Sequence, residues 1–336
     1  MSTPLVSILL PAFDNAATLA ATLATVVAQD WPAWELLIVD DASQDETLVL
    51  AQAFAALHAR RVQVLAHAEN AGAGIARNTA LAASSGVYIA SLDADDLWDS
   101  SKLRCQVAAL EASPAAAMVW GPGWYADSAG AATRLQAVPL PPTTALLPVP
   151  ALVALMLDGV APFTSSVMMR REAAVAVGGY EPLRRGQDMS LLFKLAAAWP
   201  TLYDPEPRCR YRLHEGSSTR WCERQLLSAQ RDDLYYRWVA GYLGCVPAVA
   251  HLAPRAQLRV EQQRRFVVAE QLVAALTPDE AAALSLWLAQ GADLGATPCY
   301  AKLQELCGEG DGAQLPADMA AALLSSLAAS AAPGTV

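Results

Sequence analysis

The chain has 336 residues, of which 54% are hydrophobic and 17% are charged, a composition typical of a packed globular protein and not of a disordered one. Its formal net charge of −10 argues against a protein that binds the phosphate backbone of nucleic acid. The six cysteines form no CxxC pair, which predicts reduced thiols in a cytoplasmic protein. We find no signal peptide and no apolar run of ~18 residues, so we expect a soluble protein without a transmembrane segment.

Short apolar runs alternate with segments of helical periodicity through the first 100 residues. The runs expected to be strands are residues 5–10, 35–39, 62–66 and 87–92. The segments expected to be helices are residues 15–28, 45–58 and 74–84. This alternation predicts βαβ units, and therefore an α/β fold with a mainly parallel sheet flanked by helices.

The pattern changes after residue 100. Helices are expected at 102–112 and 188–198, and strands at 116–121, 163–169 and 209–213. Five prolines in residues 139–150 predict an extended surface connection. Beyond about residue 220, helical periodicity at 223–243, 256–276, 279–289 and 317–330 predicts an all-helical C-terminal region. We therefore expect one domain over 1–219, with halves 1–100 and 101–219, and a helical domain or subdomain over 220–336.

Polar residues follow each of the first four expected strands. After the fourth strand they form the acidic segment Asp93-Ala-Asp95-Asp96. Ligands of such sheets bind outside the carboxyl ends of the strands, so we expect a site at this edge. If strand geometry continues, Asp93 and Asp95 point the same way and Asp96 points the opposite way. Two converging carboxylates suit Mg²⁺ or Mn²⁺. The alternative is that the aspartates from Asp93 to Asp99 cap the helix that follows.

Two stretches carry a resemblance to a known family. They read VSILLPAFDNAATLAATLATVVAQDWPAWELLIVDDASQDET and NAGAGIARNTALAASSGVYIASLDADDLW. Together they resemble the nucleotide-sugar-binding half of family 2 glycosyltransferases, which have the GT-A fold. The resemblance is almost continuous over residues 5–99 and looser to about residue 219. It implies an enzyme that transfers a sugar from a nucleotide-diphosphate donor.

The resemblance also implies which residues bind the donor. In chain order they are Pro11, Ala12, Asp14, Asp40, Asn70, Gly72, Arg77, Asn78, Asp93 and Asp95. Asp40 would accept a hydrogen bond from the base, Asp93 would bind the ribose and Asp95 the metal, with Asp96 as an auxiliary. An Asp40 carboxylate can accept from an imide N–H, which favours uracil or thymine over adenine. Arg77 carries a permanent charge that suits phosphate, and its alternative is a surface arginine on a helix.

The second half resembles the family in two places. Gly178-Gly-Tyr180 followed by RGQDMSLLFK resembles the segment whose Glu-Asp pair precedes a helix and supplies the general base, here Asp188. Gln187 stands where the family has glutamate, and the alternative for Asp188 is a helix N-cap.

YRLHEGSS resembles the element whose histidine, here His214, reaches the diphosphate or completes the metal shell. A structural histidine is its alternative.

We therefore expect an inverting glycosyltransferase of the hexosyltransferase class that depends on Mn²⁺ or Mg²⁺ and works in surface polysaccharide biosynthesis. UDP is the favoured nucleotide, with dTDP and GDP open, and the acceptor is a glycan, a lipid-linked glycan or a protein. Peripheral membrane association and a homo-oligomer through the C-terminal helices stay open. A sugar nucleotidyltransferase is disfavoured because PAFDN replaces the usual Gly-rich loop. A non-catalytic nucleotide-sugar-binding or scaffold protein is the alternative from another class.

Overall fold

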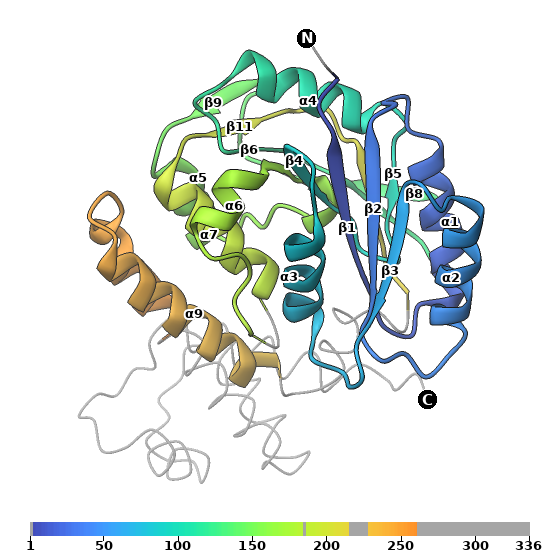
Figure 1. The fold of residues 1–336 in the computed structure, drawn as a ribbon. Coiled ribbons are helices and arrows are strands. Elements are labelled where there is room, and N and C mark those ends of the chain that lie inside the picture. Colours follow the sequence, from blue (N-terminus) through green and yellow to red (C-terminus); the bar gives the residue numbers. More distant parts are fainter. Residues whose placement is uncertain (1–2, 184–185, 215–227, 261–336) are drawn as a thin grey trace, which may run out of the picture. The chain divides into compact units, whose positions relative to one another are not determined.

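The computed structural model describes residues 3–183, 186–214 and 228–260. They form an eight-stranded sheet in the order β3-β2-β1-β4-β10-β6-β11-β9 and a four-stranded sheet in the order β5-β12-β7-β8, with helices on both faces of the larger sheet (Figure 1). The predicted α/β fold is therefore confirmed. The large sheet is parallel from β3 to β4 and mixed beyond β4.

The first half folds as the apolar runs predict. Its strands are β1 (Val6–Ala12), β2 (Trp34–Asp40), β3 (Val62–Ala66) and β4 (Tyr88–Ser91), and its helices are α1 (Ala16–Val27), α2 (Thr47–Leu57) and α3 (Ala73–Ala83). Every residue of β1 is buried, because helices cover both faces of a parallel sheet. Right-handed crossovers place α1 and α2 on one face, and the reversal from β3 to β4 places α3 on the other (Figure 1).

In the second half, α4 (Lys102–Ala112), β6 (Met118–Trp120), α7 (Gln187–Ala198) and β12 (Cys209–Arg212) lie where they were predicted. The strand predicted at 163–169 is wrong over its first part. There the chain forms a single 3₁₀ turn, η1 (Thr164–Ser166), and the strand β10 is Met168–Arg170. Because β10 runs antiparallel to β4, η1 lies at the edge of the sheet where β4 ends.

The small sheet was not predicted. It consists of β5 (Leu97–Trp98), β12, β7 (Trp124–Ala126) and β8 (Ala132–Leu135). Of these strands only β12 was predicted, because β5, β7 and β8 have two to four residues and are too short to show a periodic pattern. Their pairing matters for the site, because β12 lies against β5 directly after the acidic segment.

The proline-rich stretch is extended, as predicted, but it is more than a surface connection. Within it, β9 (Ala145–Leu147) pairs with β11 (Thr201–Tyr203) as the edge strand of the large sheet. Proline is compatible with this position because an edge strand leaves part of its backbone unpaired. The helices α5 (Ala151–Leu157) and α6 (Arg171–Ala176) complete the second half.

The chain divides into two compact units, Met1–Trp221 with Gly241–Ala253, and Cys222–Ala240 with Pro254–Val336. Both sheets belong to the first unit. Of the predicted C-terminal helices, the structure describes the first as α9 (Ser228–Cys245). The short turn η2 (Ala250–Leu252), which was not predicted, follows it. The helices predicted at 279–289 and 317–330, and most of 256–276, lie outside the described residues. No helix in the described part of the chain is long and apolar enough to cross a membrane.

Candidate functional site

The acidic segment after β4 is a turn and not a continued strand. It is closed by a hydrogen bond from the backbone N–H of Asp96 to the carbonyl of Asp93, with an N···O distance of 3.1 Å. Strand geometry therefore does not continue through Asp93 and Asp95, and the condition for the strand-alternation argument is not met. Each carboxylate has its own partner instead. The capping alternative is wrong for Asp93, Asp95 and Asp96, because the N-cap of α4 is Ser101, and of the acidic residues in this segment it is Asp99 that accepts from the Ser101 backbone N–H.

Asp93 forms an ion pair with Arg77 from α3, whose Nη2 lies 2.5 Å from Oδ1. Arg77 is only 3% exposed, so the alternative of a surface arginine is wrong. Burial alone would lower the pKa of Arg77, but the carboxylates of Asp93 and Asp188 raise it and keep the guanidinium charged. Its Nε and Nη1 have no hydrogen-bond partner among the described residues. Arg77 thus places a buried positive charge close to two carboxylates.

Asp95 contacts His214, with 3.0 Å between Oδ2 and Nε2. Both side chains are partly exposed, at 23% and 21%. Within residues 3–183, 186–214 and 228–260, no group of three or more His, Cys, Asp or Glu side chains could hold a metal ion. Asp95 and His214 would offer a cation one oxygen and one nitrogen ligand, at a position that is partly exposed. That set fits a Mg²⁺ or Mn²⁺ ion that takes its other ligands from water and substrate phosphate.

Asp96 points into the protein and is 1% exposed. Its Oδ2 accepts from Ser165 Oγ at 2.6 Å, and its Oδ1 accepts from the backbone N–H of Arg212 at 3.0 Å. Burial raises the pKa of Asp96 well above its ordinary value, and the nearby charges of Asp95 and Asp93 raise it further. Through these two hydrogen bonds, Asp96 links the acidic turn to η1 and to β12.

The two aspartates that end β2 have different surroundings. Asp40 Oδ2 accepts from the backbone N–H of Ser43 at 3.2 Å, while its Oδ1 is buried without a hydrogen-bond partner among the described residues. A buried acceptor without a partner is costly, so Asp40 has the property expected of a group that a ligand satisfies. Asp41 accepts from Nδ1 of His67 at 2.7 Å and from the backbone N–H of Gly72 at 2.7 Å.

The first loop and the loop before α3 lie at the same edge of the sheet. Pro11 and Ala12 are the last two residues of the buried strand β1, and the carbonyl of Ala12 accepts from the backbone N–H of Asp41 at 2.8 Å. Asp14 is exposed, has a φ of 52°, and its Oδ1 accepts from the backbone N–H of Gln44 at 2.7 Å. Asn70 Nδ2 donates to the carbonyl of Asp41 at 3.3 Å.

Gly72 is the N-cap of α3 with a φ of 94°, a conformation that a residue with a Cβ rarely adopts. This backbone conformation accounts for glycine at that position. The predicted members of the donor site thus come from four loops that the parallel sheet brings to one edge.

Asp188 lies in the first turn of α7, whose N-cap is Gly186, so the N-cap alternative is wrong. Its Oδ2 accepts from Thr164 Oγ1 at 2.7 Å and its Oδ1 accepts from the backbone N–H of Met189 at 2.9 Å. Gln187 packs against Gly74 of α3: a Cβ added to Gly74 would lie 2.9 Å from Cβ of Gln187. Gln187 Oε1 is buried without a hydrogen-bond partner among the described residues. The start of α7 therefore packs closely against the first turn of α3.

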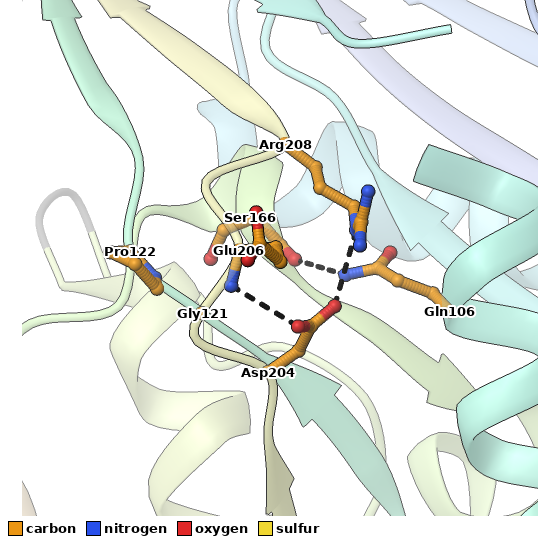
Figure 2. A pocket seen from close by; sticks show the side chains of 7 residues that line it. All are labelled: Gln106, Gly121, Pro122, Ser166, Asp204, Glu206 and Arg208. Atoms are coloured by element: carbon orange, nitrogen blue, oxygen red, sulfur yellow. Dashed lines mark hydrogen bonds and ion pairs between the residues drawn. The ribbon is translucent and has the colours of Figure 1, made fainter. Parts of the chain in front are cut away.

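A small cavity elsewhere has a different character (Figure 2). It is lined by Gln106, Gly121, Pro122, Ser166, Asp204, Glu206 and Arg208, none of which was predicted as a site residue. Asp204 Oδ2 accepts from Arg208 Nε at 3.2 Å across it. Its volume of about 10 Å³ holds about one water molecule. It is too small for a nucleotide or a sugar.

Sequence reasoning missed three residues that build the site. Asp41 anchors the loop before α3, and Thr164 and Ser165 hold Asp188 and Asp96. A signal was present for the last two, since three hydroxyl residues interrupt an apolar run in FTSSVMM. Asp41 directly follows Asp40, and the sequence does not distinguish the roles of two adjacent carboxylates.

Comparison with known proteins identifies the family of this chain. The family model for glycosyl transferase family 2 matches residues 7–174. The chain is 39% identical over 104 residues to TuaG of Bacillus subtilis, named for teichuronic acid biosynthesis, which is 31% of this chain and 41% of TuaG. It is 39% identical over 106 residues to the Escherichia coli enzyme WfgD, named UDP-Glc:alpha-D-GlcNAc-diphosphoundecaprenol beta-1,3-glucosyltransferase, which is 32% of this chain and 41% of WfgD. The chain thus spans about two-fifths of the length of these relatives.

Solved structures show the same fold. Residues 1–349 of Staphylococcus aureus TarS, in complex with UDP-GlcNAc, superpose with a TM-score of 0.62 at 14% identity over 97% of this chain and 91% of TarS 1–349. The mannosyltransferase PcManGT of Pyrobaculum calidifontis, in complex with GDP-Man and Mn²⁺, gives a TM-score of 0.58 at 20% identity over 98% of this chain and 87% of its own. Because the family model covers half of the residues, the chain belongs to glycosyl transferase family 2.

Proposed function

We propose that this protein is an inverting, metal-dependent glycosyltransferase that moves a sugar from a nucleotide-diphosphate donor to an acceptor hydroxyl in surface-glycan biosynthesis. One observation carries the proposal. The Arg77–Asp93 pair, the Asp95–His214 pair and Asp188 all belong to one edge of the large sheet, where the charges of Asp93 and Asp188 both act on Arg77. Donor binding and proton removal are thereby available within one site.

For the donor we propose a UDP-sugar. The unpartnered Oδ1 of Asp40 can accept from the imide N–H of uracil, which guanine and adenine do not offer in the same arrangement. WfgD is named for UDP-Glc and a structural neighbour binds UDP-GlcNAc, which supports this choice. Another structural neighbour binds GDP-Man, so GDP donors belong in the test.

For the cofactor we propose Mn²⁺ or Mg²⁺ held by Asp95 and His214. When bound, the cation would neutralise charge on the departing diphosphate. Arg77 adds a fixed positive charge beside Asp93 at the same edge. The exposed fractions of Asp95 and His214 leave room for water and phosphate ligands.

For the chemical step we propose a single displacement with Asp188 as the general base. The acceptor oxygen forms a bond to the anomeric carbon while the bond from that carbon to the diphosphate oxygen breaks. The acceptor proton passes to Asp188, and the nucleoside diphosphate leaves with the electron pair of the broken bond. One displacement inverts the anomeric configuration. Thr164 and Met189 hold the carboxylate ready to accept.

For the acceptor we propose a glycan on a lipid carrier, because WfgD is named for a diphosphoundecaprenol-linked sugar. Such a substrate would bring the protein to the inner face of a membrane as a peripheral enzyme. The region 220–336 is proposed as a separate helical domain or subdomain, available for that contact or for pairing with a second copy.

The test is a donor panel with Mn²⁺. UDP-glucose, UDP-N-acetylglucosamine and GDP-mannose are incubated with the protein and lipid-linked or free glycan acceptors, and the nucleoside diphosphate released is measured. The anomeric configuration of the product is read by NMR. Turnover of a UDP-sugar with inversion supports the proposal. Pyrophosphate release from a nucleoside triphosphate would instead indicate a nucleotidyltransferase, and a folded protein that binds no nucleotide would indicate a scaffold.

A further inference from the structure

The 3₁₀ turn η1 lies between the proposed base and the acidic turn, and no motif identified it. Thr164 Oγ1 donates to Asp188 Oδ2 at 2.7 Å, and Thr164 is 9% exposed. The second oxygen of Asp188 accepts from the backbone N–H of Met189. Each carboxylate oxygen thus has one fixed donor. A second lone pair on each oxygen stays available for an acceptor hydroxyl.

The other two residues of η1 are held by neighbouring elements. Ser165 Oγ donates to Asp96 Oδ2 at 2.6 Å and also accepts from the backbone N–H of Asp93 at 3.1 Å. The carbonyl of Ser165 accepts from Trp98 Nε1 at 2.8 Å. Both Ser165 and Trp98 are buried, at 0% and 5% exposed. The turn is therefore anchored to the acidic turn through hydrogen bonds that are shielded from water.

A second anchor comes from α4. Gln106 Nε2 donates to the carbonyl of Ser166 at 2.7 Å, and Gln106 Oε1 accepts from Lys102 Nζ at 2.7 Å. All three residues are buried. Every residue of η1 is thus fixed by a side chain from outside the turn.

We propose that Thr164 is a positioning residue for Asp188. Its hydroxyl donates to the carboxylate and holds it in one orientation. Because Ser165 is fixed to the acidic turn, η1 also sets the distance between the base and the donor-binding carboxylates. This inference rests on the proposed function, in which Asp188 removes the acceptor proton.

The charged and titratable groups that act on Asp188 come from three other places. Arg77 of α3 is the positive one, Asp93 of the acidic turn is the negative one, and Tyr180 precedes α7. Tyr180 is buried, and burial raises its pKa, so it stays neutral in the working range of pH. Removing the Thr164 hydroxyl leaves all three in place, so a change in the NMR signal of the Asp188 carboxylate reports the lost hydrogen bond.

The experiment compares Thr164→Val with Thr164→Ser in the full chain. The carboxyl-carbon NMR signal of Asp188 is followed at one fixed pH, with its signal assigned as the one missing from Asp188→Asn. Thr164→Val keeps the shape and removes the donor, so we expect this signal to shift. Thr164→Ser should restore the wild-type position. In the UDP-sugar assay, Thr164→Val should lower kcat about tenfold with KM for the donor unchanged within twofold.

The matched control is Ser166→Ala, which removes a hydroxyl of the same turn. That hydroxyl donates to the carbonyl of Phe163 at 2.7 Å. Ser166→Ala should keep the wild-type NMR signal of Asp188. An unchanged signal in Thr164→Val, or an equal shift in Ser166→Ala, would overturn the inference. If the signal shifts as expected but the wild type releases no nucleoside diphosphate from any donor, the proposed function fails and the hydrogen bond's effect on Asp188 is still established.

Discussion

Nε2 of His214 lies 3.0 Å from Oδ2 of Asp95, although the two residues are 119 positions apart in the sequence. The small sheet creates this contact. Trp98, three residues after Asp95, pairs with Cys209, five residues before His214. A short strand pairing therefore brings an imidazole to the acidic turn. This pair is the expected cation site.

Replacing either partner should weaken cation-dependent nucleotide binding. With UDP at 100 times its dissociation constant and Mn²⁺ present, we expect the wild type to gain roughly 2.7 kcal/mol in free energy of unfolding. Asp95→Ala and His214→Ala should each weaken this binding at least about tenfold, because a metal ligand is lost. The shift of the thermal unfolding midpoint with and without Mn²⁺ measures it.

The matched control for these variants is Asp30→Ala. Asp30 also pairs with a basic side chain, Arg104 at 2.8 Å, but both groups are largely exposed. An exposed pair contributes little, so this variant should respond to UDP and Mn²⁺ like the wild type. If His214→Ala kept the full Mn²⁺-dependent shift, the assignment of His214 to the cation would be wrong.

Asp188→Asn should separate chemistry from binding. Asparagine keeps the shape and can still accept from Thr164, but it cannot take a proton. We expect kcat to fall by about a hundredfold to ten-thousandfold, the usual contribution of a general base. The UDP- and Mn²⁺-dependent thermal shift should stay. Steady-state release of UDP from the best donor measures kcat, and a variant with near wild-type kcat would remove Asp188 from the mechanism.

The first half of the fold was predictable because its information is local. Buried parallel strands read as apolar runs, and the acidic and glycine residues directly follow those runs. The course of the acidic turn was not predictable in the same way. Asp96 is turned inward by Ser165 and by the N–H of Arg212, which come from distant parts of the chain.

The second half was less predictable because its strands are short and its contacts are non-local. FTSSVMM reads as one strand, but its hydroxyl residues form a turn fixed by Trp98 and Gln106. The proline-rich stretch hides an edge strand because its partner, β11, lies more than 50 residues further on. The position of Asp188 was readable from its motif, whereas its contact with Thr164 required the structure.

Lys102 allows a prediction about stability and pH. It is 0% exposed, and its Nζ lies 4.2 Å from the centroid of the Trp98 ring. Burial lowers the pKa of Lys102 from 10.5 to about 7. Between pH 7 and pH 10.5, Lys102 binds a proton in the unfolded chain but not in the folded chain. The contribution of Lys102 to the free energy of unfolding therefore rises with pH in this range. Below about pH 7 both states are protonated and this contribution is constant.

Lys102→Met should therefore lose stability relative to the wild type as pH rises. We expect the difference in free energy of unfolding to change by up to about 2 kcal/mol between pH 7 and pH 9. Urea unfolding followed by tryptophan fluorescence at several pH values measures it. Arg104→Met, on the same helix but with its side chain 52% exposed, is the control and should follow the wild-type pH dependence. Parallel curves for Lys102→Met and the wild type would show that the ammonium is not desolvated.

Gly74 tests the contact between α3 and α7. A Cβ at this position would lie 2.8 Å from the carbonyl oxygen of Glu181 and 2.9 Å from Cβ of Gln187. Gly74→Ala should therefore push the start of α7 away from α3. We expect a loss of about 1–3 kcal/mol in free energy of unfolding, despite the better helix propensity of alanine, together with a lower kcat. Denaturant unfolding and UDP release measure the two effects.

Gly241→Ala in α9 is the matched control, because a Cβ there meets nothing within 4 Å among the described residues. Helix propensity alone predicts a gain of about 0.5–1 kcal/mol for it. The two substitutions are chemically identical, so the difference between them isolates the steric contact. If Gly74→Ala were as stable and as active as the wild type, α7 would have room to move. Asp188 would then depend on the Thr164 hydroxyl, and not on helix packing, for its position.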